Sequence, residues 1–189
     1  MDHSLDYGWM RGARRVESPN CGPRPAGAEP ELLVIHNISL PPGEFENDCV
    51  LQLFTNCLDW SAHPYFEGIR GLEVSSHFLI RRSGELIQFV SCDDRAWHAG
   101  QSSYCGRDNC NDFSIGIELE GTDELPYTDA QYQQLADLSR ALIAGYPGLT
   151  REHIAGHSDI APGRKTDPGP AFDWQRYRNS IADTEVRIA

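Results

Sequence analysis

Short apolar runs that alternate with segments of helical spacing limit this chain to an α/β fold. Residues 32–36 (Leu-Leu-Val-Ile-His) form a run typical of a buried strand. Residues 114–120 alternate Ile and Leu with Gly and Glu, and this period of two places Glu118 and Glu120 on one face of a strand. Together the patterns predict strands at residues 32–36, 74–80, 85–90, 114–120 and 154–157.

Three further segments carry apolar residues at helical spacing. Residues 48–58 form the first of them. Residues 128–146 form the clearest helix, because Thr128 and Gln131 resemble a capping box at its start. A last helix is expected at residues 173–181. Strands interleaved with helices predict α/β layers around a central sheet.

The first thirty residues differ from the rest in being rich in Pro, Gly and Arg. This composition predicts an extended arm, residues 1–30, packed on one domain formed by residues 31–189. A chain of 189 residues suits a single hydrophobic core. The N-terminus (Met-Asp-His-Ser-Leu-Asp) carries acids and no apolar segment, so we expect no secretory signal.

The formal net charge of −12 disfavours two classes of partner. A field of this sign repels nucleic acid and anionic membrane surfaces. No apolar run approaches the roughly 20 residues that a membrane span needs. The six cysteines contain no C-x-x-C pair, and we expect free thiols in a reducing compartment. The chain is therefore expected to be cytoplasmic, without nucleic-acid or membrane partners.

Two histidines and an aspartate stand where they could bind a metal. His36 and His157 each end an expected strand, and Asp167 follows in a loop. Two histidines and a carboxylate are a ligand set of catalytic zinc sites that leave the fourth position to water. The residues alone also allow simpler interpretations, in which His36 is a hydrogen-bonded core histidine and Asp167 only starts a turn before Pro168. The spacing does not decide between them.

Several local motifs occur in a fixed order along the chain. They are Val34-Ile35-His36-Asn37, Ser76-His77-Phe78-Leu79-Ile80, Arg95-Ala96-Trp97-His98-Ala99-Gly100, Gly116-Ile117-Glu118, Gly156-His157-Ser158-Asp159-Ile160-Ala161-Pro162 and Arg164-Lys165-Thr166-Asp167-Pro168-Gly169. In this order they resemble the zinc N-acetylmuramoyl-L-alanine amidase family, which includes peptidoglycan recognition proteins and phage lysozyme-type amidases. The stretches 37–45 and 110–123 resemble its AmpD subfamily, the cytosolic 1,6-anhydro-N-acetylmuramyl-L-alanine amidases.

The resemblance implies a fold, a metal and a set of roles. The fold would be a single α/β domain with a central mixed β-sheet flanked by helices, as in peptidoglycan recognition proteins. The expected zinc ligands are His36, His157 and Asp167. Glu118 matches the catalytic acid/base, and Lys165 matches the residue that helps to stabilise the oxyanion. Substrate contacts are expected from Asn37, Trp97, His98 and Arg107, and His77 is expected to support the site.

Two positions depart from the subfamily pattern. Glu73 and Asn109 stand where the best-known relatives carry arginines that meet the carboxylates of the substrate peptide. This departure puts the electrostatic recognition of the peptide in doubt and leaves the zinc chemistry untouched. Arg107, Arg81 and Arg95 are the candidates to replace those arginines.

The resemblance therefore predicts a monomeric zinc hydrolase of peptidoglycan recycling. Its expected substrates are soluble muropeptides, in which it would cleave the amide between the lactyl group of anhydromuramic acid and L-alanine. By family analogy, its activity would limit the muropeptide signal that induces β-lactamase. One alternative is a peptidoglycan receptor that kept the fold and lost catalysis, which would lack a ligand or Glu118. A lytic amidase for intact murein is the other alternative.

Overall fold

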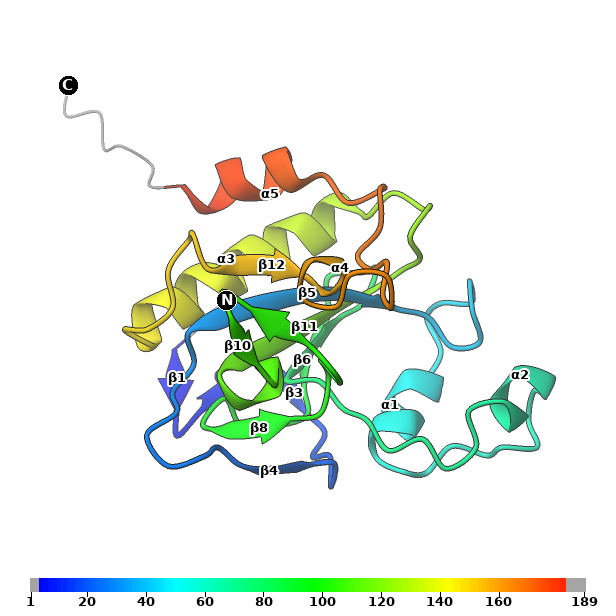
Figure 1. Cartoon of the computed structure of the whole chain (residues 1–189). Coiled ribbons are helices and arrows are strands. Elements are labelled where there is room, and N and C mark those ends of the chain that lie inside the picture. The colour runs from blue at the N-terminus through cyan, green and yellow to red at the C-terminus, as the bar shows by residue number, and fades with distance from the viewer. Residues whose placement is uncertain (1–3, 183–189) are drawn as a thin grey trace.

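The computed structural model describes residues 4–182, which are built around one mixed six-stranded sheet (Figure 1). The strand order across this sheet is β12-β5-β11-β6-β7-β3. The strands are β3 (Arg14–Arg15), β5 (Leu32–Ile38), β6 (Phe78–Ile80), β7 (Leu86–Gln88), β11 (Ser114–Glu120) and β12 (Ile154–Gly156). Neighbouring strands are parallel, except that β6 and β7 form an antiparallel pair. The predicted α/β class with a central mixed sheet is confirmed.

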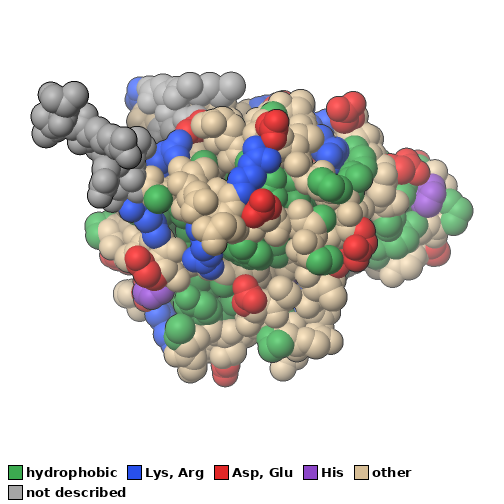
Figure 2. Space-filling model, turned by 90° about the horizontal axis from the view of Figure 1, so that it is seen from above, with side chains coloured by type: hydrophobic (Ala, Val, Ile, Leu, Met, Phe, Trp, Pro, Cys, Tyr) green, Lys and Arg blue, Asp and Glu red, His purple; other side chains and the backbone are tan. Residues whose placement is uncertain are grey.

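Helices cover the two faces of this sheet unequally. They are α1 (Cys49–Phe54), α2 (Pro64–Glu67), α3 (Asp129–Gly145), α4 (His157–Ile160) and α5 (Trp174–Ile181), with a 3-10 helix at Cys110–Asp112. The long helices α3 and α5 lie together on one face, whereas α1 and α2 lie beyond one end of the other (Figure 1). The α3–α5 face presents mixed acidic and basic side chains rather than one charged patch (Figure 2).

Alternation along β5 explains how the sheet is buried on both sides. Leu33 and Ile35 pack into the core beneath α3 and α5. Leu32 and Val34 point to the opposite face, and His36 follows them with the same parity. A parallel strand buried on both faces therefore delivers a histidine to the side away from the long helices.

The helix predicted at residues 128–146 is confirmed as α3. Thr128 caps it, its hydroxyl accepts from the Gln131 N–H, and the Gln131 side chain accepts from the Thr128 N–H. The helix predicted at 48–58 is shorter than expected, because Asn56 adopts a positive φ of 58° just past its end. The strand predicted at 74–80 is also shorter, because Ser75 bonds to Trp97 and Asn20 instead of extending β6.

The N-terminal segment is joined to the rest of the fold through short strands. Four of them lie before residue 24: β1 (Leu5–Asp6), β2 (Trp9–Met10), β3 and β4 (Cys21–Pro23). Strand β3 adds the last strand to the sheet, and β4 pairs with β8 (Asp94–Ala96). The strands β9 (Ser103–Tyr104) and β10 (Arg107–Asp108) form a separate hairpin. All six cysteines are free thiols, and among residues 4–182 no helix is long and apolar enough to cross a membrane.

Candidate active site

The register of the parallel strands brings the predicted reactive residues together near the carboxyl ends of these strands. Strand β11 pairs with β5 so that Glu118 lies directly beside His36. Strand β12 lies on the other side of β5, pairs Gly156 with Ile35, and is followed at once by His157. The carboxyl ends of parallel strands are where α/β folds usually bind ligands. All three side chains are buried, with exposed fractions of 1% for His36, 7% for Glu118 and 3% for His157.

Three donor atoms converge near these strand ends and form a nearly regular triangle. The two Nδ1 atoms of His36 and His157 are 2.9 Å apart. The Oδ2 atom of Asp167 lies 3.1 Å from the first and 3.0 Å from the second. Within the described residues, His36, His157 and Asp167 are the group that could hold a metal ion. Zinc bonds of about 2.0–2.1 Å separate neighbouring ligand atoms of a tetrahedron by about 3.3 Å, close to these spacings.

The outer ring nitrogens of the two histidines show which nitrogen is available to a metal. His157 donates its Nε2 proton to the Ala99 carbonyl at 3.1 Å, which leaves a lone pair on Nδ1. His36 Nε2 lies 2.9 Å from His98 Nδ1. Burial lowers the pKa of His36 to about 4, so its ring is neutral at pH 7. Two lone pairs and a carboxylate oxygen at this distance repel one another unless a cation lies between them, and the site therefore fits a divalent metal.

Glu118 is the unsatisfied group of the site. Its Oε2 atom is buried and has no hydrogen-bond partner. Burial, reinforced by the nearby charge of Asp167, raises the pKa of Glu118 well above its usual value, and Lys165 opposes the rise. A buried carboxylate without a partner costs stability, so its retention indicates a chemical role. A glutamate with a raised pKa is suited to exchange protons near neutral pH.

A cavity of about 240 Å³ opens onto these residues. Its polar end contains His36, His157, Asp167, Glu118 and Lys165. The apolar part of its lining comes largely from the α1–α2 region, with contributions from Leu53, Phe54, Tyr65, Ile69 and Leu72. The cavity therefore combines charged residues with apolar ones, of which Tyr65 and Leu72 are partly exposed. Such a cavity suits a substrate that has both a scissile polar bond and an apolar surface.

Lys165 reaches this cavity from the loop that also carries Asp167. Its backbone N–H donates to the Ala161 carbonyl, which fixes the start of the loop. The Ser158 N–H donates to the Asp167 carbonyl and ties the loop back to α4. Lys165 is also the only lysine of the 189 residues.

The predicted substrate contacts divide into two groups. Asn37 and Trp97 line the cavity, although the Asn37 amide nitrogen donates to Asp123 and to the Pro168 carbonyl. His98 also lines it, but this side chain is 8% exposed and its two ring nitrogens face His36 and Ser114. The observed contacts of the His98 ring nitrogens are therefore with other protein groups.

Arg107, predicted as a substrate contact, does not line this cavity. Its guanidinium donates to Glu31 at 2.6 Å and lies over the Phe113 ring, on the hairpin of β9 and β10. The other two candidate arginines are also held by acids outside the cavity lining: Arg81 by Asp48 and Glu85, and Arg95 by Asp112. None of these three arginines lines the cavity at His36.

Two residues that support the site escaped the sequence analysis. Arg24 donates to four backbone carbonyls, those of Cys92, Asn111, Asp112 and Ser114. Ser114 contacts the His98 ring. Neither residue belongs to a motif whose chemistry indicates a site, because their partners are distant in sequence. His77, expected to support the site, accepts a hydrogen bond from the Gly116 N–H through Nδ1 and packs beside His98.

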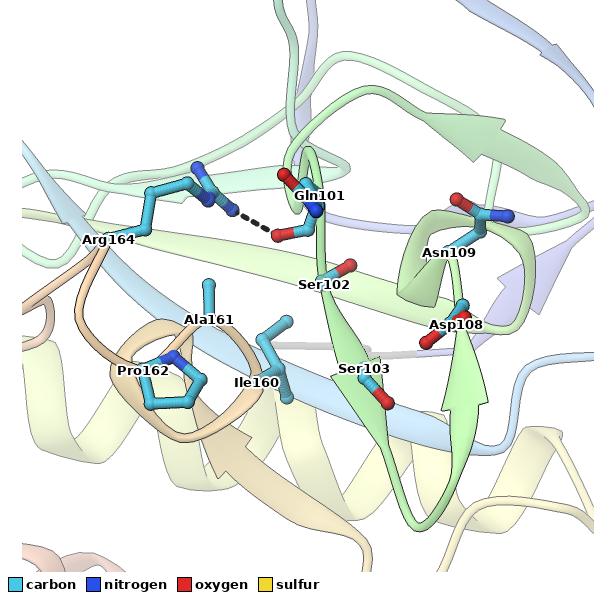
Figure 3. A pocket seen from close by; sticks show the side chains of 9 residues that line it. All are labelled: Gln101, Ser102, Ser103, Asp108, Asn109, Ile160, Ala161, Pro162 and Arg164. Atoms are coloured by element: carbon cyan, nitrogen blue, oxygen red, sulfur yellow. Dashed lines mark hydrogen bonds between the residues drawn. The ribbon is translucent and has the colours of Figure 1, made fainter.

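Figure 3 shows a second cavity, of about 520 Å³. It is lined by residues 101–103, by Asp108 and Asn109, and by residues 160–162 with Arg164. The Arg164 guanidinium donates to the Gln101 carbonyl (Figure 3). It also donates to the Ala99 carbonyl. Arg164 thereby shares the Ala99 carbonyl with His157 and links this cavity to the metal-binding triangle.

Comparison with known proteins gives a consistent result. The family model described as N-acetylmuramoyl-L-alanine amidase matches residues 26–170. The protein of Citrobacter freundii named 1,6-anhydro-N-acetylmuramyl-L-alanine amidase AmpD is 62% identical over 174 residues, which make up 92% of this chain and 92% of that protein. The protein of the same name from Haemophilus influenzae is 48% identical over 177 residues, or 94% of this chain and 96% of that one.

Solved structures agree with these sequence matches. The crystal structure of a selenomethionine derivative of AmpD superposes with a TM-score of 0.92 at 61% identity and covers 94% of this chain and 99% of that chain. The Escherichia coli amidase AmiD was solved with its substrate anhydro-N-acetylmuramic acid-L-Ala-D-γ-Glu-L-Lys. It matches with a TM-score of 0.59 at 31% identity, over 83% of this chain and 60% of that chain.

Proposed function

This chain belongs to the N-acetylmuramoyl-L-alanine amidase family, and we propose that it is a zinc enzyme that cleaves 1,6-anhydro-muropeptides. The bond cleaved is the amide between the lactyl carbonyl carbon of anhydromuramic acid and the nitrogen of L-alanine. The observation that carries this proposal is the triangle of His36, His157 and Asp167 with the buried, unpartnered Oε2 atom of Glu118 beside it. Relatives named for the 1,6-anhydro substrate support the choice of sugar.

His36, His157 and Asp167 would hold the zinc ion. When bound, zinc supplies Lewis acidity that polarises a carbonyl and makes water more acidic. The protein's own contribution is to hold two imidazoles and one carboxylate at fixed positions, so that little reorganisation accompanies the reaction.

Glu118 carries out the proton transfers in this proposal. It accepts a proton from the attacking water as the new carbon–oxygen bond forms at the lactyl carbonyl. It then delivers that proton to the alanine nitrogen as the carbon–nitrogen bond breaks, which gives a free carboxylic acid and a free amine. Lys165 contributes a positive charge beside the oxygen that becomes negative between these two steps. No covalent intermediate with the enzyme is needed.

The cellular setting belongs to the same proposal. We place the enzyme in the cytoplasm as a monomer, acting on soluble fragments during peptidoglycan recycling and so limiting the muropeptide signal for β-lactamase induction. The resemblance of residues 37–45 and 110–123 to the cytosolic subfamily supports this setting. The net charge of −12 disfavours close approach to the anionic polymers of the wall.

A receptor without activity is the main competing function. Such a protein needs neither a complete ligand triangle nor a buried, unpartnered glutamate, and both are present here. The test is mass-spectrometric product analysis after zinc-loaded protein is incubated with 1,6-anhydro-N-acetylmuramyl-tripeptide. Free peptide and free anhydromuramic acid should appear, and both should be lost with chelator or in Glu118→Ala.

Parallel incubations sharpen the substrate class. The same tripeptide on a reducing-end muramic acid and intact murein sacculi should be cleaved more slowly than the anhydro substrate. Faster release from sacculi would instead favour a lytic amidase. Binding without cleavage by the zinc-loaded protein would make this chain a receptor.

A further inference from the structure

His98 stands between the first metal ligand and a buried serine. Its Nδ1 atom lies 2.9 Å from His36 Nε2, and its Nε2 atom lies 3.1 Å from the Ser114 hydroxyl. Ser114 in turn lies 2.6 Å from the Cys110 carbonyl through the same hydroxyl oxygen. His98 is 8% exposed and Ser114 is fully buried, so water does not replace these contacts. The three polar groups form one chain that leads from His36 into the protein interior.

The Cys110 carbonyl at the inner end of this hydrogen-bonded series sets the direction of every hydrogen bond in it. A carbonyl oxygen only accepts, so the Ser114 hydroxyl proton points to Cys110. Its oxygen is then available to accept the Nε2 proton of His98. A neutral imidazole has one proton, so His98 Nδ1 is an acceptor and His36 Nε2 must be the donor. The lone pair of His36 is thereby left on Nδ1, the atom that faces His157 and Asp167.

The position of His98 is itself built into the sheet. A Cβ atom on Gly116 would lie 2.5 Å from His98 Cγ, so the ring packs directly on the backbone of β11 where a side chain is absent. The backbone N–H groups of His98 and Ala99 both donate to the Asn111 side chain. Arg24 holds the inner end of this series of hydrogen-bonded groups by donating to the Ser114 carbonyl.

We propose that His98 and Ser114 are positioning residues that hold His36 with its Nδ1 lone pair toward the metal. This inference rests on the proposed zinc dependence. Outer partners of this kind commonly change metal affinity by about 10–100-fold when they are removed. The Ala99 carbonyl orients the His157 ring in the same way, and a carbonyl oxygen can only accept a hydrogen bond. His36 is oriented instead by the His98 imidazole. The Nδ1 atom of His98 accepts a hydrogen bond only while Ser114 keeps the His98 proton on Nε2.

Zinc affinity, measured by competition with a chromophoric chelator, is the first readout. Ser114→Ala removes the acceptor for His98 and should weaken zinc binding about 10–100-fold. Ser139→Ala is the matched control, because Ser139 is also fully buried and hydrogen-bonded but contacts Leu135 and Tyr177, away from the site. Equal zinc affinities of the two variants, at equal stability in urea, would overturn the inference.

Two amide substitutions separate positioning from space filling. Asn at position 98 places an acceptor where Nδ1 was, facing His36, whereas Gln places its amide nearer the Nε2 position, facing Ser114. His98→Asn should therefore bind zinc more tightly than His98→Gln, although Gln fills the space better. The reverse order would show that His98 acts only by its volume.

The third readout is independent of activity and of the Ser114 variant's folding. Nitrogen-15 NMR of the imidazoles should find the proton of His98 on Nε2, both in the zinc-free and in the zinc-loaded wild-type protein. A proton on Nδ1 would overturn the relay even if the protein binds zinc. Failure of the wild type to bind zinc at all would instead refute the proposed function and leave the His98 tautomer to decide the relay.

Discussion

The two ends of the active-site cavity are built in different ways. The metal-binding part is carried by β5, β11 and β12, and its two histidines are buried and hydrogen-bonded through their outer ring nitrogens. The apolar wall comes from the α1–α2 region, where Tyr65 and Leu72 are each 44% exposed. Helix α2 has only four residues and lies away from the sheet (Figure 1). The reactive residues are thus carried by the sheet, whereas the expected contacts with the rest of the substrate come from the more exposed α1–α2 region.

This difference predicts that substitutions at the sheet end affect the chemical step, whereas those at the wall affect substrate binding. Loss of a ligand should give the largest effect. His157→Ala leaves two donors of three and should abolish both stoichiometric zinc binding and amidase activity. Atomic absorption after dialysis, together with product analysis, checks this. His153→Ala, on the same segment but outside the triangle, should retain both. Full activity of His157→Ala would contradict the assigned ligand set.

Glu118→Gln should give the next largest effect. It keeps the shape of the side chain but removes the proton acceptor, so kcat should fall about 10²–10⁴-fold while zinc remains bound. Steady-state kinetics with a zinc determination on the same sample separates the two effects. A KM that rises with little change in kcat would place Glu118 in binding rather than in proton transfer.

Lys165 should contribute less, because it is exposed and acts through charge alone. As the only lysine, it can be modified selectively together with the terminal amine. Acetylation removes its charge and should lower kcat about 10²–10³-fold, whereas reductive methylation retains the charge and should change kcat little. Because both reagents also modify the terminal amine, each serves as the control for the other. Equal losses would argue against an electrostatic role.

The apolar wall should show the opposite kinetic pattern. Leu72→Ala removes a half-exposed apolar contact and should raise KM a few-fold, about 1 kcal/mol or less, with kcat nearly unchanged. Leu125→Ala is the matched control, because Leu125 is 38% exposed but lies outside the cavity lining. A large loss of kcat in Leu72→Ala would mean that the wall takes part in the chemical step, which would blur the contrast between the two ends.

The last expected effect is on stability rather than on activity. In the folded zinc-free protein the pKa of Glu118 is raised above its unfolded value of about 4.3, so the folded state holds this proton more tightly. The associated stability is complete below the unfolded pKa and is lost as pH rises through the folded pKa. Glu118→Gln should therefore be more stable than the wild type at pH 8 by about 1–3 kcal/mol, and the gap should narrow near pH 4. Urea unfolding in chelator checks this; a pH-independent difference would contradict the linkage.

Much of the fold and the reactive set could be predicted because the signals are local. The capping box of Thr128 and Gln131 marked the start of α3 correctly. The alternation in residues 114–120 placed Glu118 in a strand, and the ordered motifs singled out the residues that the triangle brings together. The pairing of Arg107 with Glu31 could not be predicted, because it depends on how the β9–β10 hairpin lies against the segment that precedes β5.

The sequence by itself determined which residue types stand at the strand ends and therefore which chemistry this chain can support. Only the tertiary structure decided how those residues are oriented. The pairing of β5 with β11 sets His36 beside Glu118, and the contacts of His98 with Ser114 and Gly116 select the nitrogen that His36 offers to a metal. These contacts join residues that are distant along the chain, and hydrogen-bond direction depends on distance and orientation in space. Neither quantity is written in the order of the amino acids.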